Sequence, residues 1–304
     1  MISGFKGMSP IGVIKQAGKD FGEHDMTTHA AALTYRFLLA VFPFLIVVLT
    51  VLGALNMEEF FDAMLNEARK ALSPELYTQF DAILTQVESG ASGGLLSFGL
   101  VLAIWSAAGG VRSVMHALNV AYDVEEERTF WKKYLASVIY TIGLAAILLS
   151  ALVLMFLGPQ TIGWIADQVG LGTVFVGIWT WLRIPVAIVL MVVAVALMYY
   201  FFPNVEQPFV IVSPGSVIAV LGWVIATLGF SFYVSNFGNY NATYGSLAGV
   251  IILLFFFYIS SGVLLLGAEI NAVIFKAHPE TDTSNLDADN VREAKREASD
   301  DAEA

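Results

Sequence analysis

The stretch YGSLAGVIILLFFFYISSGVLLLGAEINAVIF, residues 244 to 275, decides the fold class of this chain. It holds 32 residues with a single charged side chain, Glu269. A helix of about 20 apolar residues is long enough to cross a bilayer. The stretch is therefore predicted to be a transmembrane helix.

The two ends of this predicted helix differ in character. Its last turns carry Glu269 and Asn271, whose polar groups are costly in hydrocarbon unless they find partners. Its first turns carry small residues that let another helix approach closely, and glycines four residues apart lie on one helix face. The predicted helix-packing motif consists of Tyr244, Gly245, Ser246 and Gly249, with both glycines facing a neighbouring helix.

The composition extends this reading to the whole chain. Of 304 residues, 57% are hydrophobic and 13% charged, and the mean hydropathy is +0.73. These values are typical of a membrane protein. There is no cysteine, which excludes disulfides and thiolate chemistry, and the four histidines are scattered along the sequence. We therefore predict no metal site, no cofactor and no enzymatic activity.

The net charge of −11 is unevenly distributed. Residues 276 to 304 hold nine acidic residues against four basic ones, which argues against a nucleic-acid partner. With few apolar residues, this segment is predicted to be an acidic, disordered cytoplasmic tail. An acidic surface adapted to high salt is the alternative interpretation.

Hydropathy predicts an all-α polytopic membrane protein with six transmembrane helices. Pro43 and Pro185 lie inside predicted spans, where proline removes a backbone donor and bends the helix. The predicted spans are residues 29–55, 94–118, 134–157, 174–201, 214–235 and 244–275.

Two amphipathic regions accompany the spans. Residues 56–93 predict an extracytoplasmic helical hairpin between the first two spans, which favours packing over the bundle rather than a binding site. Residues 1–28 predict a cytoplasmic, interfacial segment, and a frayed leader is the alternative because several glycines weaken the helix. The apolar face predicted for that segment comprises Ile11, Ile14, Ala17 or Gly18, and Phe21.

The distribution of basic residues predicts the orientation. With six spans both termini lie on one side, and the segments on that side hold 10 Lys and Arg residues against two on the other. The positive-inside rule therefore places both termini in the cytoplasm and the chain in the cytoplasmic membrane.

Several stretches resemble one family of integral membrane proteins, the YihY/BrkB family, formerly labelled ribonuclease BN. They are AALTYRFLLAVFPFL (31–45), LNVAYDVEEERTFWKKYL (118–135), YYFFPNVEQPF (199–209) and NATYGSLAGVIILLFFFYISSGVLLLGAEINA (241–272).

The resemblance covers residues 10 to 275 and implies six transmembrane helices, a cytoplasmic-membrane location and a function described for the family mostly as unknown or as transport. It supplies no catalytic residues. This chain departs from the family in the acidic residues of its second cytoplasmic loop. The matching motif positions are Tyr35, Pro43, Asn119, Pro203, Asn204, Tyr244, Gly245, Ser246, Gly267, Glu269 and Asn271.

Polar residues within the spans define the candidate site. Arg36 lies about seven residues beyond the cytoplasmic start of the first span, and Glu269 lies about six before the cytoplasmic end of the last, so both have similar depth. We predict that Glu269 and Asn271, with Arg36 or alternatively Arg112, form a polar site facing the cytoplasm. The alternative is that Arg36 reaches the interface instead.

Two classes of function remain open at this stage. A transporter or translocator of a lipid, an amphiphile or another small molecule would use the intramembrane polar residues as part of a path. A scaffold or assembly factor would use the same residues to lock its helices together. A nuclease or an intramembrane protease is disfavoured, because its metal-ligand or catalytic clusters are missing from the predicted spans.

Overall fold

The structure is a computed structural model in which seven α-helices and no strands are described. The described residues are 9–54, 93–156, 173–208, 210, 212–237 and 248–277. The helices are α1 (Pro10–Glu23), α2 (Met26–Ala54), α5 (Gly93–Ala121), α6 (Phe130–Phe156), α8 (Thr173–Phe201), α9 (Pro214–Phe237) and α11 (Ala248–Lys276).

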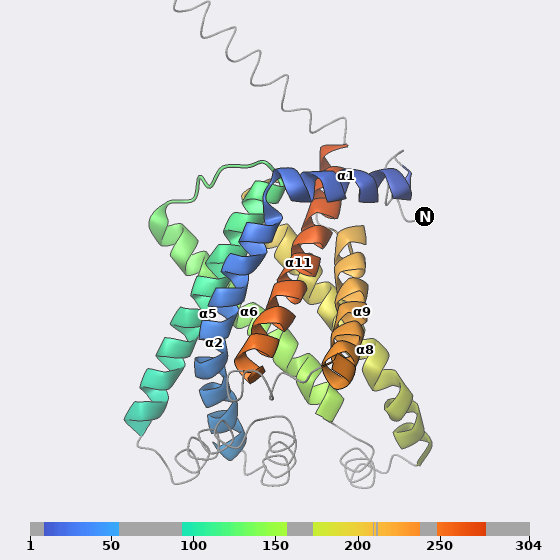
Figure 1. The fold of residues 1–304 in the computed structure, drawn as a ribbon. Coiled ribbons are helices and arrows are strands. Elements are labelled where there is room, and N and C mark those ends of the chain that lie inside the picture. Colours follow the sequence, from blue (N-terminus) through green and yellow to red (C-terminus); the bar gives the residue numbers. More distant parts are fainter. Residues whose placement is uncertain are drawn as a thin grey trace, which may run out of the picture.

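Six of these helices are long and run alternately toward and away from the end of the bundle where α1 lies, called the α1 end below (Figure 1). Each begins and ends within four residues of a predicted span. Helices α5, α6, α8, α9 and α11 are long and apolar enough to cross a membrane. Helix α2 has 29 residues, and its role as a sixth span stays a prediction.

Some predicted features lie outside the described residues. They are the hairpin at 56–93, the tail beyond residue 277, and the first three members of the packing motif, at 244–246. Helix α2 continues through position 43, and α8 contains Pro185 in its interior, so the two bends stay predictions.

Helix α1 lies across the α1 end of the bundle, over α11 (Figure 1). Ser9 caps it, because its hydroxyl accepts a hydrogen bond of 3.0 Å from the Gly12 amide. Val13 and Ala17 are fully buried against the last turns of α11. Ile11 and Ile14, which belong to the apolar face predicted to lie in the membrane interface, are 79% and 54% exposed, and that interfacial placement stays a prediction. The contact with α11 was not predicted, and of its two buried α1 residues Ala17 belongs to the predicted apolar face whereas Val13 does not.

The core lies close to the same end. It joins the first half of α2, the second half of α5 and the last turns of α11, with Tyr199 from the end of α8 and Phe202 directly after that helix. Its fully buried members include Met26, Leu33, Met115, Leu118 and Leu265. The polar side chains of His24 and Glu269 lie beside this core, near Met26 and Ala268 in sequence.

Candidate functional site

A tight turn between α1 and α2 positions His24. The His24 amide donates to the Asp20 carbonyl at 2.8 Å, and Asp25 has a φ of 50°, a left-handed conformation that aspartate tolerates. The Thr27 hydroxyl donates to the Asp25 carboxylate at 3.2 Å. A side-chain hydrogen bond with Thr28 lowers the pKa of Asp25, because it favours the carboxylate form.

His24 reaches Glu269 of α11, whose side chain is fully buried. The Nδ1 atom of His24 lies 2.8 Å from Glu269 Oε1, and its Nε2 atom lies 3.2 Å from Asp123 Oδ1. Lys276 pairs with the other oxygen of Asp123 and donates to the Ala121 carbonyl at 3.2 Å. Glu269 Oε2 has no hydrogen-bond partner among the described residues. This polar chain connects the α1–α2 turn, the loop after α5, and α11.

Asn271, two residues further along α11, caps a neighbouring helix. Its Oδ1 accepts a 2.8 Å hydrogen bond from the Gly215 amide in the first turn of α9, and its Nδ2 donates to Ser213 Oγ at 2.7 Å. The first amides of a helix have no partner within it, so a side chain from α11 satisfies one of them here.

Helices α9 and α11 touch at two glycines beside Asn271. A Cβ atom on Gly215 would overlap the Gly267 carbonyl oxygen and lie 2.6 Å from Asn271 Cγ. A Cβ on Gly267 would lie 2.6 Å from both Ala219 Cβ and the Tyr199 hydroxyl. Gly249, where a close approach was predicted, is exposed. Among the described residues, the close approach of α9 to α11 lies toward the other end of α11, and the prediction for Gly245 stays untested.

The two arginines of the predicted site line a different space, called the arginine cavity below. It has a volume of about 450 Å³ and lies between α2, α5 and the first turns of α6. An atom placed as Cβ on Gly109 would lie 3.5 Å from Arg36 Nη1 and 3.6 Å from Arg112 Nη2, so both guanidiniums converge on this glycine. Its lining residues are His29, Ala32, Arg36, Gly109, Arg112, Ser113, His116, Phe130, Lys133 and Tyr134.

The structure therefore does not assemble the four predicted residues into one site. His24 occupies the position beside Glu269 that the depth argument assigned to Arg36 or Arg112. His24 was missed because it lies outside every predicted span. His29 and His116 are far apart in sequence, yet their rings are 5.5 Å apart because α2 packs on α5. Within the described residues, no three His, Asp or Glu side chains are grouped as a metal site requires.

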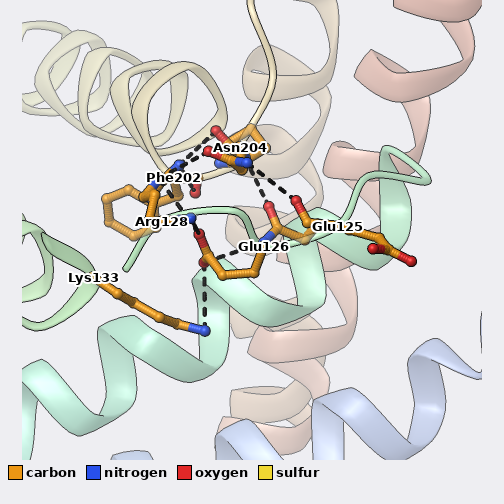
Figure 2. A network of polar contacts seen from close by, with 8 residues as sticks. Glu125, Glu126, Arg128, Lys133, Phe202 and Asn204 are labelled. Carbon is orange, nitrogen blue, oxygen red and sulfur yellow. Dashed lines mark hydrogen bonds and ion pairs between the residues drawn. The ribbon is translucent and has the colours of Figure 1, made fainter. Parts of the chain in front are cut away.

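Hydrogen bonds and ion pairs link the loop after α5 to the residues that follow α8 (Figure 2). Arg128 Nη2 donates to the carbonyls of Phe202 and Pro203, both at 2.9 Å. The Asn204 amide donates to Asn119 Oδ1 at 2.7 Å. Glu126 lies 3.6 Å from Arg128 and 3.4 Å from Lys133. Asn119, Pro203 and Asn204 are all motif positions of the resemblance, and the fold brings them together.

We expect Arg128→Ala to lower the free energy of unfolding by about 2 kcal/mol, because it leaves two carbonyls and the Asn204 side chain without their donor. Thermal unfolding of the purified full chain in detergent measures this change. Lys132→Ala removes an exposed cation nearby and is the control. Equal unfolding temperatures for both variants would contradict the structural role of the network.

A second space, the central cavity, lies inside the bundle and has a volume of about 550 Å³. Its lining comes from all six long helices and is almost entirely apolar. It includes Phe37 of α2, Gly110 of α5, Ala145 of α6, Ala194 of α8, Trp223 of α9 and Leu264 of α11. None of its described lining residues also lines the arginine cavity.

These helices and cavities define a polytopic α-helical membrane protein with a polar network at one end and an apolar space in its interior. The chain belongs to the virulence factor BrkB family, whose model matches residues 17–292. The resemblance seen in the sequence is thereby confirmed.

Two relatives extend this comparison. The chain is 36% identical over 263 residues to YfkH of Bacillus subtilis (strain 168), named as ribonuclease-like, and the match covers 86% of this chain and 95% of YfkH. It is 29% identical over 271 residues to a UPF0761 membrane protein of Rhodospirillum centenum, covering 87% of this chain and 57% of that longer protein. No solved structure matches the chain.

Proposed function

We propose that this protein takes an amphiphile between its helices and moves it across the cytoplasmic membrane. The central cavity carries this proposal. Its volume of about 550 Å³ lies in the range of ligand pockets, and its apolar walls suit a hydrocarbon chain. The proposal assigns no catalytic residue, no cofactor and no nucleic-acid partner.

The polar groups of the central cavity support a hydrocarbon ligand rather than an ion. The Thr141 hydroxyl donates to the Ser137 carbonyl of its own helix at 2.7 Å. Ser260 Oγ accepts a hydrogen bond of 3.1 Å from the Trp223 indole. No described lining residue is charged. An ion would need polar ligands in place of its water, and these walls offer few.

The edge of the bundle supports access from the lipid. Leu148 and Leu149 of α6 line the central cavity and are 49% and 38% exposed, so α6 bounds the cavity next to the surrounding hydrocarbon. The excess of Lys and Arg at the α1 end supports placing that end, with both termini, in the cytoplasm.

A scaffold that transports nothing is the second candidate. The glycine contact between α9 and α11 favours it, because Asn271 and Glu269 then serve only to hold helices together. In that case the central cavity would hold a static lipid chain.

The test compares two alanines of α6. Ala145 lines the central cavity, whereas Ala146 is exposed and does not. We expect the full chain in vesicles to move fluorescent phospholipids between leaflets, measured by dithionite quenching. Ala145→Phe should lower the rate to that of protein-free vesicles because the ring fills the cavity, while Ala146→Phe should leave it unchanged.

Two results would overturn the proposal. One is wild-type protein that moves no lipid of a panel with different headgroups, which would favour the scaffold. The other is Ala145→Phe protein that folds and transports at the wild-type rate.

A further inference from the structure

We propose that the arginine cavity is a binding site for a phosphate-type oxyanion, such as the headgroup of an anionic phospholipid. This inference does not rest on transport, because the arginine cavity and the central cavity are lined by different residues. It rests on the charge, geometry and surroundings of the arginine cavity.

The charges of the cavity have one sign. Arg36, Arg112 and Lys133 are cations at neutral pH, and no described residue that lines the cavity is acidic. Lys133 shares its charge with Glu126, whose carboxylate lies 3.4 Å away. The two arginines have no such carboxylate within ion-pair distance among the described residues. Within the part of the chain that the structure describes, the two arginine charges of the cavity therefore have no counter-ion.

The arginines are also arranged around one point. Arg36 Nη1 and Arg112 Nη2 lie 3.5 Å and 3.6 Å from the Cβ position of Gly109, so these two nitrogen atoms are at most about 7 Å apart. Two like charges so close repel each other, and an anion between them removes the repulsion. Planar guanidiniums donate two parallel hydrogen bonds to phosphate oxygens, which a single ammonium group does not.

Arg112 is held in place for this role. Its guanidinium carbon lies 4.2 Å from the centre of the Tyr134 ring, and its Nη1 donates to Ser137 Oγ at 3.0 Å. The Tyr134 ring covers the face of the guanidinium, and Ser137 occupies its Nη1 donor, while Nη2 points toward Gly109. A donor fixed before the ligand arrives loses little entropy on binding.

The surroundings of the cavity favour a lipid headgroup. Phe130 and Trp131 in the first turn of α6 are 60% and 79% exposed. Exposed aromatic side chains near the end of a span are typical of the level of the headgroups. Basic pockets between transmembrane helices at that level hold anionic headgroups. A phospholipid bound there would place its phosphate between the arginines and its chains along the exposed faces of α5 and α6.

Native mass spectrometry of the purified full chain in detergent tests the site with three probes. Phosphatidic acid carries a phosphate, diacylglycerol carries the same chains without it, and inorganic phosphate carries no chains. We expect wild-type protein to retain phosphatidic acid and not diacylglycerol. Inorganic phosphate that binds as tightly as phosphatidic acid would assign the same site to a soluble anion instead of a lipid.

Three variants locate the binding. Arg36→Gln with Arg112→Gln should weaken phosphatidic acid binding about tenfold or more. Gly109→Leu keeps both charges but fills the point where the guanidiniums converge, and it should weaken binding as well if the double variant is too unstable to purify. Lys132→Gln removes an exposed cation that does not line the cavity, and it should bind like the wild type.

The proposal fails if diacylglycerol binds as well as phosphatidic acid, or if the double arginine variant and Gly109→Leu both keep wild-type affinity. Ala145→Phe should not change phosphatidic acid binding, because Ala145 lines only the central cavity. A failure of the translocation proposal is thereby distinguished from a failure of the headgroup site.

Discussion

Gly215→Ala is expected to lower the free energy of unfolding by about 3 kcal/mol or more, the largest effect among single substitutions considered for this protein. The added methyl group would overlap the Gly267 carbonyl oxygen, which is backbone and cannot rotate away. It would also push Asn271 from the Gly215 amide that it caps. Both effects separate α9 from α11.

Gly229→Ala is the matched control. Gly229 lies on the same helix, and no heavy atom lies within 4 Å of the position of its Cβ. Because alanine favours a helix over glycine by up to about 1 kcal/mol in water, this variant should be as stable as the wild type or slightly more stable. Thermal unfolding in detergent, with size-exclusion chromatography for aggregation, measures both. Similar unfolding temperatures for the two variants would show that the glycine contact is dispensable.

His24→Ala is expected to produce the second large effect, a loss of about 3 kcal/mol. His24 makes a hydrogen bond with the buried carboxylate of Glu269. Removing the His24 ring leaves both oxygens of that carboxylate without a donor among the described residues. A buried carboxylate without a partner lowers the stability of the folded state, because it has lost its hydrogen bonds to water and forms none with the protein.

A double-mutant cycle identifies the cause of this loss. His24→Ala combined with Glu269→Gln should recover most of the lost stability, because the second change removes the buried charge. His116→Ala is the control, since His116 contacts the His29 ring and forms no ion pair with a carboxylate of the described residues. Strictly additive effects of the two substitutions would refute the coupling between His24 and Glu269.

The six long helices were predictable because each contains more than enough apolar residues to cross hydrocarbon. The packing face of α1 was not. The helical period placed Ile11, Ile14 and Ala17 on a face predicted to lie in the membrane interface, but a helix at the end of a bundle can turn one apolar surface to the protein and another outward. Periodicity identifies apolar positions without identifying what covers them, and here Val13 and Ala17 face α11.

The polar residues of the candidate site could be predicted from the sequence, but which of them contact one another could not. Polar residues inside apolar spans are costly, so Arg36, Arg112, Glu269 and Asn271 could be selected from hydropathy alone. Their partners depend on helix rotation, which span boundaries do not determine. Equal depth suggested an arginine for Glu269, whereas rotation turns Arg36 and Arg112 toward Gly109.

Gly215 was overlooked for a related reason. Ser213 and Pro214 mark the start of a helix, and a glycine in that first turn has no distinctive meaning in a single sequence. Only the position of α11 shows that its backbone fills the space of the missing side chain.

The contact between the backbones of α9 and α11 also restricts how the protein can move. Helices separated by side chains can slide by small changes of rotamer, but two touching backbones interlock. Asn271 joins α11 to α9, and His24 joins α11 to the α1–α2 turn. We therefore expect α9, α11 and this turn to move together as one rigid unit. If the central cavity widens, we therefore expect α6 and α8 to move relative to α9 and α11, with the predicted bend at Pro185 inside α8.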